Sequence, residues 1–128
     1  MADTVKTQVL HEDEHRYVAY FTNVSDGTGE SAVVKIDVSA LSPACSEVRI
    51  RKVKWATHGM SVKMLWDATA DTLIMVLPES TRGELDFSKY GGLVNSAGAG
   101  KTGDVLFTTI GHAAGDAYFV LLDCEKVY

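Results

Sequence analysis

The stretch Val48-Arg-Ile-Arg-Lys-Val-Lys-Trp55 decides how the chain is expected to fold. Apolar and charged residues alternate along it, as they do in a β-strand that has one face on a core and the other in solvent. The apolar residues stand at even positions in the first half, Val48 and Ile50, and at odd positions in the second, Val53 and Trp55. One extra residue near Arg51-Lys52 would let both pairs face inward, so the stretch predicts a strand with a β-bulge or sharp bend there.

Alternation of this kind recurs along the chain. Two further sets of residues each predict one buried strand face: Val34, Ile36 and Val38, and then Val62, Met64 and Trp66. Segments 72–77 and 117–122 carry apolar residues at both even and odd positions, as expected of central strands or of strands at a subunit contact. Residues 65–77 are also long enough for a buried helix, but the β-rich composition Thr-Leu-Ile-Met-Val favours a turn followed by a strand.

Turn-forming residues separate these segments at fairly even spacing, which is typical of an all-β sandwich or barrel. A chain of 128 residues fits one domain. We therefore expect residues 1–128 to form a single β-sandwich of about eight strands, jelly-roll-like or Ig-like, with residues 1–14 as a candidate N-terminal arm.

A glycine-rich connection runs from Gly83 to Asp104 and holds six of the eleven glycines. Long connections inside compact domains are usually functional, or disordered when alone. Gly100-Lys101-Thr102 resembles half of a phosphate-binding loop, but Asn95 stands where that motif needs glycine, and the residues that follow are β-like rather than helical. The sequence therefore predicts a flexible loop and no bound nucleotide.

Composition excludes several classes of protein. The net charge is −5, with acids concentrated in residues 1–30 and bases in residues 48–63, which suggests two electrically different faces. The longest apolar run, 117–122, is far shorter than the ~20 residues that span a bilayer. The start of the chain lacks a signal-peptide layout, so we expect synthesis in a cytoplasm and no membrane partner. The two cysteines, Cys45 and Cys124, are expected to be reduced packing residues, with a disulfide or metal site as the alternative.

Few residues suggest chemistry. His11 and His15 have the spacing of metal ligands on a helix, but the acidic residues between them read more simply as a solvated turn. His112 and Asp116 could form a general-base site, although a polar hairpin turn explains them as well. We therefore expect a protein that is not an enzyme, with no catalytic, cofactor-binding or metal-binding residues.

Surface contacts are the more promising feature. The basic segment around Trp55 could bind single-stranded nucleic acid, but it could also be a solvent-facing row or a docking face for an acidic partner. The acidic overall balance makes nucleic acid the less favoured partner. The candidate interface residues are Arg49, Arg51, Lys52, Lys54, Tyr90, Gly91, Gly92 and Lys101.

The run Gly103-Asp-Val-Leu-Phe-Thr-Thr-Ile-Gly-His-Ala-Ala-Gly-Asp-Ala-Tyr-Phe-Val-Leu-Leu122, followed by Lys126 and Tyr128, resembles the closing hairpin of small virion structural proteins of tailed bacteriophages. A weaker similarity extends back to Trp55 through His58-Gly59, Trp66-Asp67 and the segment from Asp86 to Gly92. The resemblance brings no catalytic motif.

This resemblance implies a cement or decoration protein on the capsid surface of a virion, made in the host cytoplasm. Its partners would be the lattice of the major capsid protein and further copies of itself. A neck, tail or fibre component, a single-stranded nucleic-acid-binding module and an enzyme using His112 remain as alternatives. The glycine-rich connection and the N-terminal segment are expected to become ordered on attachment.

Overall fold

A computed structural model describes residues 4–27 and 29–128. The described chain contains nine β-strands and two short 3₁₀ helices, η1 (Val38–Ala40) and η2 (Ser88–Tyr90), and no α-helix. The strands are β1 (Thr4–Glu12), β2 (Arg16–Val24), β3 (Val33–Ile36), β4 (Glu47–His58), β5 (Ser61–Trp66), β6 (Thr72–Leu77), β7 (Arg82–Asp86), β8 (Val105–Ile110) and β9 (Ala117–Val127).

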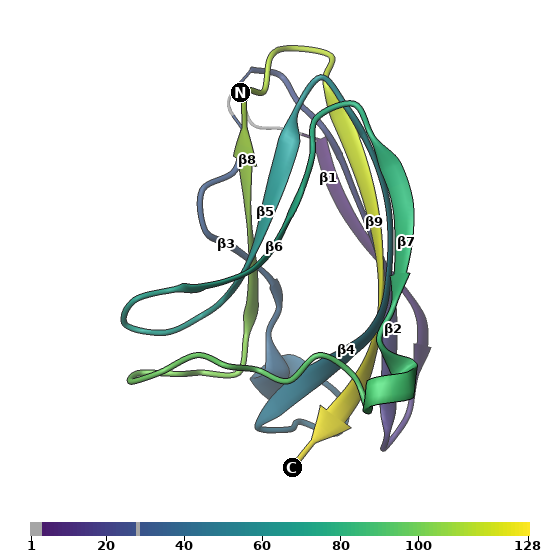
Figure 1. The fold of residues 1–128 in the computed structure, drawn as a ribbon, viewed down its shortest axis with the longest axis vertical. Coiled ribbons are helices and arrows are strands. Elements are labelled where there is room, and N and C mark those ends of the chain that lie inside the picture. Colours follow the sequence, from purple (N-terminus) through teal and green to yellow (C-terminus); the bar gives the residue numbers. More distant parts are fainter. Residues whose placement is uncertain (1–3, 28) are drawn as a thin grey trace.

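Two antiparallel sheets face each other (Figure 1). Sheet A has the order β1-β2-β9-β4-β7, and sheet B has the order β3-β8-β5-β6. The pairs β2–β9, β3–β8, β4–β7 and β5–β6 nest inside one another, as though one long hairpin had been rolled up. This arrangement of eight strands is the jelly roll. The predicted β-sandwich is therefore confirmed in its jelly-roll form, with β1 added at the edge of sheet A.

The bulge predicted in the opening stretch is present in β4. Against β9, Ile50 pairs with Cys124 and Lys52 pairs with Asp123, so Arg51 is the extra residue. Val48, Ile50 and Val53 are all fully buried on the two sides of this shift. The bulge thus keeps one strand of twelve residues in contact with the core along its length.

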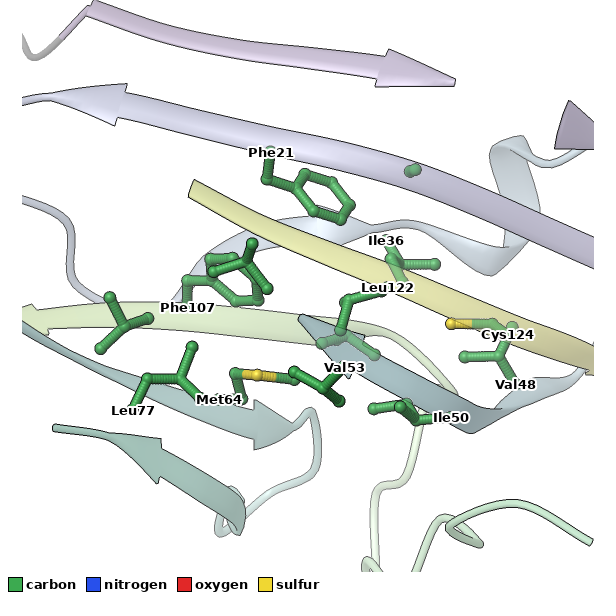
Figure 2. Packing of buried hydrophobic residues seen from close by; sticks show 14 of the residues in the cluster. Phe21, Ile36, Val48, Ile50, Val53, Met64, Leu77, Phe107, Leu122 and Cys124 are labelled. Atoms are coloured by element: carbon green, nitrogen blue, oxygen red, sulfur yellow. The ribbon is translucent and has the colours of Figure 1, made fainter. Parts of the chain in front are cut away.

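The core fills the space between the two sheets (Figure 2). Phe21 of sheet A meets Phe107 of sheet B edge to face, with 5.5 Å between ring centroids. Val62, Met64 and Trp66 are buried together on one face of β5, as their spacing predicts. Edge-to-face aromatic contacts add to area burial, so these rings help to fix how the sheets are stacked.

The prediction of central strands is right for one segment and wrong for the other. Residues 117–122 belong to β9, the middle strand of sheet A. Residues 72–77 do form a strand rather than a helix, but β6 is an edge strand of sheet B with Leu73 52% exposed. An apolar pattern on both faces cannot separate a central strand from an edge strand whose outer side is uncovered in the isolated chain.

The predicted face of Val34, Ile36 and Val38 is also partly wrong. The pairing of β3 with β8 shifts between Val34 and Ile36, so Val34 points outward and Lys35 is buried. Val38 is buried, but it lies in η1 beyond the end of the strand. An irregularity in a strand of only four residues moves a charged side chain into the core.

Two segments that were expected to be loose are more regular in the structure. Residues 4–12 of the predicted N-terminal arm form the edge strand β1, because their backbone pairs along β2; residues 1–3 lie outside the described residues. The start of the glycine-rich connection forms β7, which pairs with β4. The next part, with η2 and Leu93, stays against sheet A, and Leu93 pairs with Ile50 of β4. Only the later part reaches away from the sandwich beside the β5–β6 loop (Figure 1), where the backbone N–H of Thr69 donates to the Ala99 carbonyl at 3.1 Å.

Candidate interaction surfaces

The predicted basic residues of β4 lie on the outer face of sheet A. Arg49, Lys52 and Lys54 occupy positions that alternate with buried core residues, and Arg51 is the bulged residue between them. Gly92 packs directly on this row, since a Cβ there would lie 3.1 Å from the Arg49 Cβ. The structure therefore brings the Gly91-Gly92 turn against the basic row, with Leu93 and Ile50 exchanging two backbone hydrogen bonds beneath it.

Acidic residues of the neighbouring strands flank this basic row on both sides. On β9, Glu125 pairs with Arg49 and Asp123 pairs with Lys52. On β7, Asp86 pairs with Lys52, and Glu84 forms an ion pair with Lys54 at 3.8 Å. The expectation of two electrically different faces therefore fails for sheet A, where opposite charges are interleaved strand by strand.

Two ionisation shifts reflect this interleaving. The carboxylate of Asp123 binds Arg16 of β2 through both oxygens at 2.6 Å, and this hydrogen bonding raises the pKa of the Arg16 guanidinium. The pKa of Asp86 is lowered, chiefly because Ser88 donates hydrogen bonds to it and also because Lys52 and Arg51 lie near. Opposite charges that face each other across neighbouring strands add a small stabilisation to the strand pairing.

The other predicted interface residues are spread out. Tyr90, at the end of η2, is 80% exposed. Lys101 donates to the Glu47 carboxylate at 2.8 Å, and Thr102 donates to Asp67 at 2.8 Å. The strand β8 follows this loop, whereas a phosphate-binding loop requires a helix there. Lys101 and Thr102 therefore fasten the glycine-rich loop to the domain.

A shallow aromatic hollow adjoins the charged rows of sheet A. The Trp55 ring lies over Gly83, where a Cβ would come within 2.9 Å of the ring. Phe119 lines the same hollow and packs on Tyr20 with ring centroids 5.5 Å apart. Lys54, Arg82 and Glu84 complete the lining, so opposite charges meet there too.

The outer face of sheet B is different, because an apolar row crosses all four of its strands. Val34 of β3 pairs with Leu106 of β8, Leu106 pairs with Leu65 of β5, and Leu65 pairs with Leu73 of β6. Val34 is 47% exposed and Leu73 is 52% exposed, whereas their neighbours cover Leu106. We call Val34, Leu106, Leu65 and Leu73 the apolar row. In the next row Val76 is also exposed, beside Lys63.

Sequence reasoning missed the apolar row. Its members come from four separate segments, and only the register of the sheet places them side by side. The one available signal is segment 72–77, whose apolar residues at both even and odd positions predict a central strand or a subunit contact. Pairing of distant segments cannot be read from local periodicity.

The residues that suggested chemistry have local structural roles. His112 shares a hydrogen bond of 3.2 Å with Thr109, and Asp116 accepts the Ala113 backbone N–H at 2.8 Å within the β8–β9 turn. His11 contacts Asp13 at 2.8 Å, and the described residues hold no group of three or more side chains suited to a metal ion.

Both cysteines are free thiols. Burial raises the pKa of the Cys124 thiol well above its ordinary range. None of the described helices is long and apolar enough to span a bilayer.

Comparisons with known proteins add little to this geometry. No protein-family model matches the chain, and neither does any curated protein. Among solved structures, the chain is similar to a cupin superfamily protein from Desulfitobacterium hafniense, with a TM-score of 0.38 and 9% sequence identity over 100% of this chain and 82% of that one. The jelly-roll assignment therefore rests on the strand order of the chain itself.

Proposed function

We propose that the chain is a virion structural protein of a tailed bacteriophage, a cement or decoration protein that attaches to the capsid shell through the outer face of sheet B. The observation that carries this proposal is the apolar row. Its two ends are about half exposed, and it crosses the full width of the sheet. Val76 in the next row is exposed as well, and exposed apolar side chains that gather on one face of a small domain usually mark a contact with another macromolecule.

The location of the row agrees with the sequence resemblance. The similarity to phage virion proteins is strongest from Gly103 to Tyr118, which includes the whole of β8. β8 supplies Leu106 at the centre of the apolar row, and its last residue, Ile110, is exposed. Fold alone would not support a function, so the proposal rests on this surface together with the resemblance.

The mechanism is burial of apolar area on a repeating lattice. Each Å² of apolar surface removed from water contributes about 25 cal/mol, and association and ordering consume part of that gain. A single copy would therefore bind weakly. Neighbouring copies held by one lattice would reinforce one another through high effective concentration. The two tethered loops that project beyond sheet B would add contacts at one end of the face (Figure 1).

Co-sedimentation of the purified protein with empty phage heads tests this proposal. Leu73→Lys places a charge in the apolar row and should weaken binding at least about tenfold, which corresponds to 1.4 kcal/mol. Val24→Lys on β2 is the matched control, because Val24 is also 52% exposed but belongs to sheet A. That control should bind like the unchanged protein.

Equal loss of binding in the two variants, or no binding by the unchanged protein, would contradict the proposal. Binding to purified tails instead of heads would make the chain a neck or tail component that uses the same face. The interleaved charges of sheet A disfavour the nucleic-acid alternative. A polyanion that approached the lysines of β4 would also meet the carboxylates of Asp86, Glu84 and Asp123 beside them. Strong, salt-sensitive binding to single-stranded DNA would reverse that judgement.

A further inference from the structure

A cluster of polar side chains is buried between the two sheets. Lys35 of β3 and Glu30, which precedes that strand, form an ion pair of 2.5 Å with only 3% and 4% of their side chains exposed. Asn23 of β2 lies on the other side of Glu30 and is 1% exposed. The cluster thus joins a sheet A strand to a sheet B strand within the core.

One carboxylate touches both nitrogens of this cluster. Oε2 of Glu30 accepts from the Lys35 amine, and Oε1 accepts from the Asn23 amide Nδ2 at 2.9 Å. Tyr118 also donates to Oε1, at 2.5 Å. The Glu30 backbone is fixed, because its N–H donates to Thr109 Oγ1 at 2.8 Å and its carbonyl accepts the Thr109 N–H at 3.0 Å. The carboxylate is therefore held in place between an amine and a carboxamide.

The surroundings of the cluster are apolar and aromatic. The Lys35 nitrogen lies 5.9 Å from the centroid of the Phe107 ring, and Phe107 packs on Tyr118 at 5.9 Å. A buried ion pair in such a place is usually no more stabilising than well-packed apolar residues. A gain in stability therefore does not explain why Lys35, Glu30 and Asn23 are buried together. A reaction between them would explain it.

We propose that Lys35 and Asn23 become joined by an intramolecular isopeptide bond, with Glu30 as the proton carrier. Lys35 gives a proton to Glu30 Oε2, and the neutral amine attacks Cγ of Asn23. The Nζ–Cγ bond forms and the Cγ–Nδ2 bond breaks, while Glu30 delivers the first proton to Nδ2. Glu30 then takes the second proton from Nζ and passes it to the departing ammonia, so the carboxylate is restored. An ammonium side chain and a carboxamide thereby become one secondary amide and one ammonium ion, with no oxidant or cofactor.

Three features of the site favour this reaction. The nucleophile and the leaving nitrogen contact the two oxygens of the same carboxylate, so each proton has a direct path. The side chains are shielded from solvent, so water does not compete with the amine for Cγ of Asn23. The fold also holds all three side chains together permanently, which replaces a bimolecular encounter with an intramolecular one.

Intact mass spectrometry of the folded, purified protein under denaturing conditions tests the inference. The expected mass is lower than that of the sequence by one ammonia. Trypsin should then fail to cut after Lys35, leaving one peptide of residues 17–49 that carries the ammonia loss at Asn23 and Lys35. Ammonia loss within this peptide excludes succinimide formation at Asn95, which lies outside it, and fragmentation shows whether Asn23 and Lys35 are joined.

Two variants assign the roles. Glu30→Gln keeps the shape of the proton carrier but should retain the full mass and normal cleavage after Lys35. Lys63→Met removes a half-buried lysine of β5 that lies outside the cluster, and this variant should still lose ammonia. A full mass and cleavage after Lys35 in the unchanged protein, fresh and aged, would overturn the proposal without any variant having to fold. Cross-linking in Glu30→Gln would remove Glu30 from the mechanism. Neither outcome depends on capsid binding.

Discussion

Asp104, the last residue of the glycine-rich loop, is a half-buried carboxyl group whose ionisation opposes folding. Burial raises its pKa, the nearby charges of Asp37 and Asp67 raise it further, and the hydrogen bond from the Val38 backbone N–H at 3.0 Å offsets part of this. Because the pKa is higher in the folded chain than in the unfolded one, the charged carboxylate destabilises the fold above that pKa. The penalty disappears as the pH falls below the ordinary aspartate pKa of about 3.9.

Asp104→Asn should therefore be more stable than the unchanged protein at pH 7. The amide oxygen can still accept the Val38 N–H, so the substitution removes the charge and keeps the bond. The advantage in melting temperature should shrink towards zero at pH 3.5, where the aspartate is largely protonated. Thermal unfolding at the two pH values measures this. An advantage of the same size at both would assign the effect to packing instead.

Gly103 is a position where only glycine fits. Its φ is +91°, and an added Cβ would come within 2.0 Å of the Ser46 carbonyl oxygen. Gly103→Ala should lower the free energy of unfolding by more than about 2 kcal/mol. The alanine would be strained by its positive φ, and its Cβ would also clash with the backbone of Ser46.

Gly98→Ala is the control for this substitution, because Gly98 belongs to the same loop and a Cβ there has no heavy atom within 4 Å. Urea denaturation should leave this variant close to the unchanged protein. Similar losses in both variants would mean that the loop as a whole, rather than the contact with Ser46, sets the effect.

Single residues were predictable where the local pattern was long enough. The bulge at Arg51 could be read from four apolar residues that changed parity within one strand. The burial of Lys35 could not, because β3 has four residues and its irregularity leaves Val-Val-Lys-Ile looking like an ordinary alternating strand. Lys35 turns inward towards Glu30, a partner that a local pattern does not reveal.

At the scale of elements, the extra residue of β4 sets the register of its strand. Deleting Arg51 would rotate one half of β4 by one position and move either Val48 and Ile50 or Val53 out of the core. Each large residue lost from a core costs roughly 2–4 kcal/mol, so the deletion should prevent stable folding.

Arg51→Ala is the matched variant for that deletion. It keeps the residue count and the backbone carbonyl that accepts the Phe87 N–H at 2.6 Å. It should change the free energy of unfolding by no more than about 0.5–1 kcal/mol, as is usual for a surface side chain. Circular dichroism and denaturant titration compare the two. A folded deletion variant would show that β4 can shift its register freely.

Strand identity was predictable from sequence, but strand position was not. Both β6 and β9 read as strands with two apolar faces, yet one is an edge strand and the other is central. The difference lies in which distant segment pairs with each, and composition carries no such information. The exposed face of β6 is consistent with the alternative interpretation of segment 72–77, a subunit contact.

At the scale of the molecule, the nested pairing of strands predicts slow folding. The outermost pair joins Arg16 of β2 to Glu125 of β9, and every inner pair closes a shorter loop. Proteins dominated by such distant contacts fold in milliseconds to seconds. Stopped-flow refolding followed by the fluorescence of the buried Trp66 should show this range. Folding within microseconds would mean that local structure forms first and limits the rate.

The sandwich as a whole could be predicted because its signals, alternation and turns, are local. The apolar row could not be, since it exists only after four segments are aligned. The proposed basic interface is the converse case. Its residues are adjacent in sequence, but their acidic neighbours on β7 and β9 come from elsewhere and neutralise them.

The interleaved charges of sheet A have a consequence for the exterior of an assembled particle. With sheet B against the shell, sheet A would form the outer surface of the particle. Its rows of positive and negative side chains lie on neighbouring strands, only about 5 Å apart. That spacing is shorter than the ~8 Å screening length of physiological salt, so the fields cancel close to the surface. Such a surface would produce only a weak electrostatic field a short distance away. If an arginine and an aspartate of sheet A exchanged positions, the electrophoretic mobility of the particle should change little.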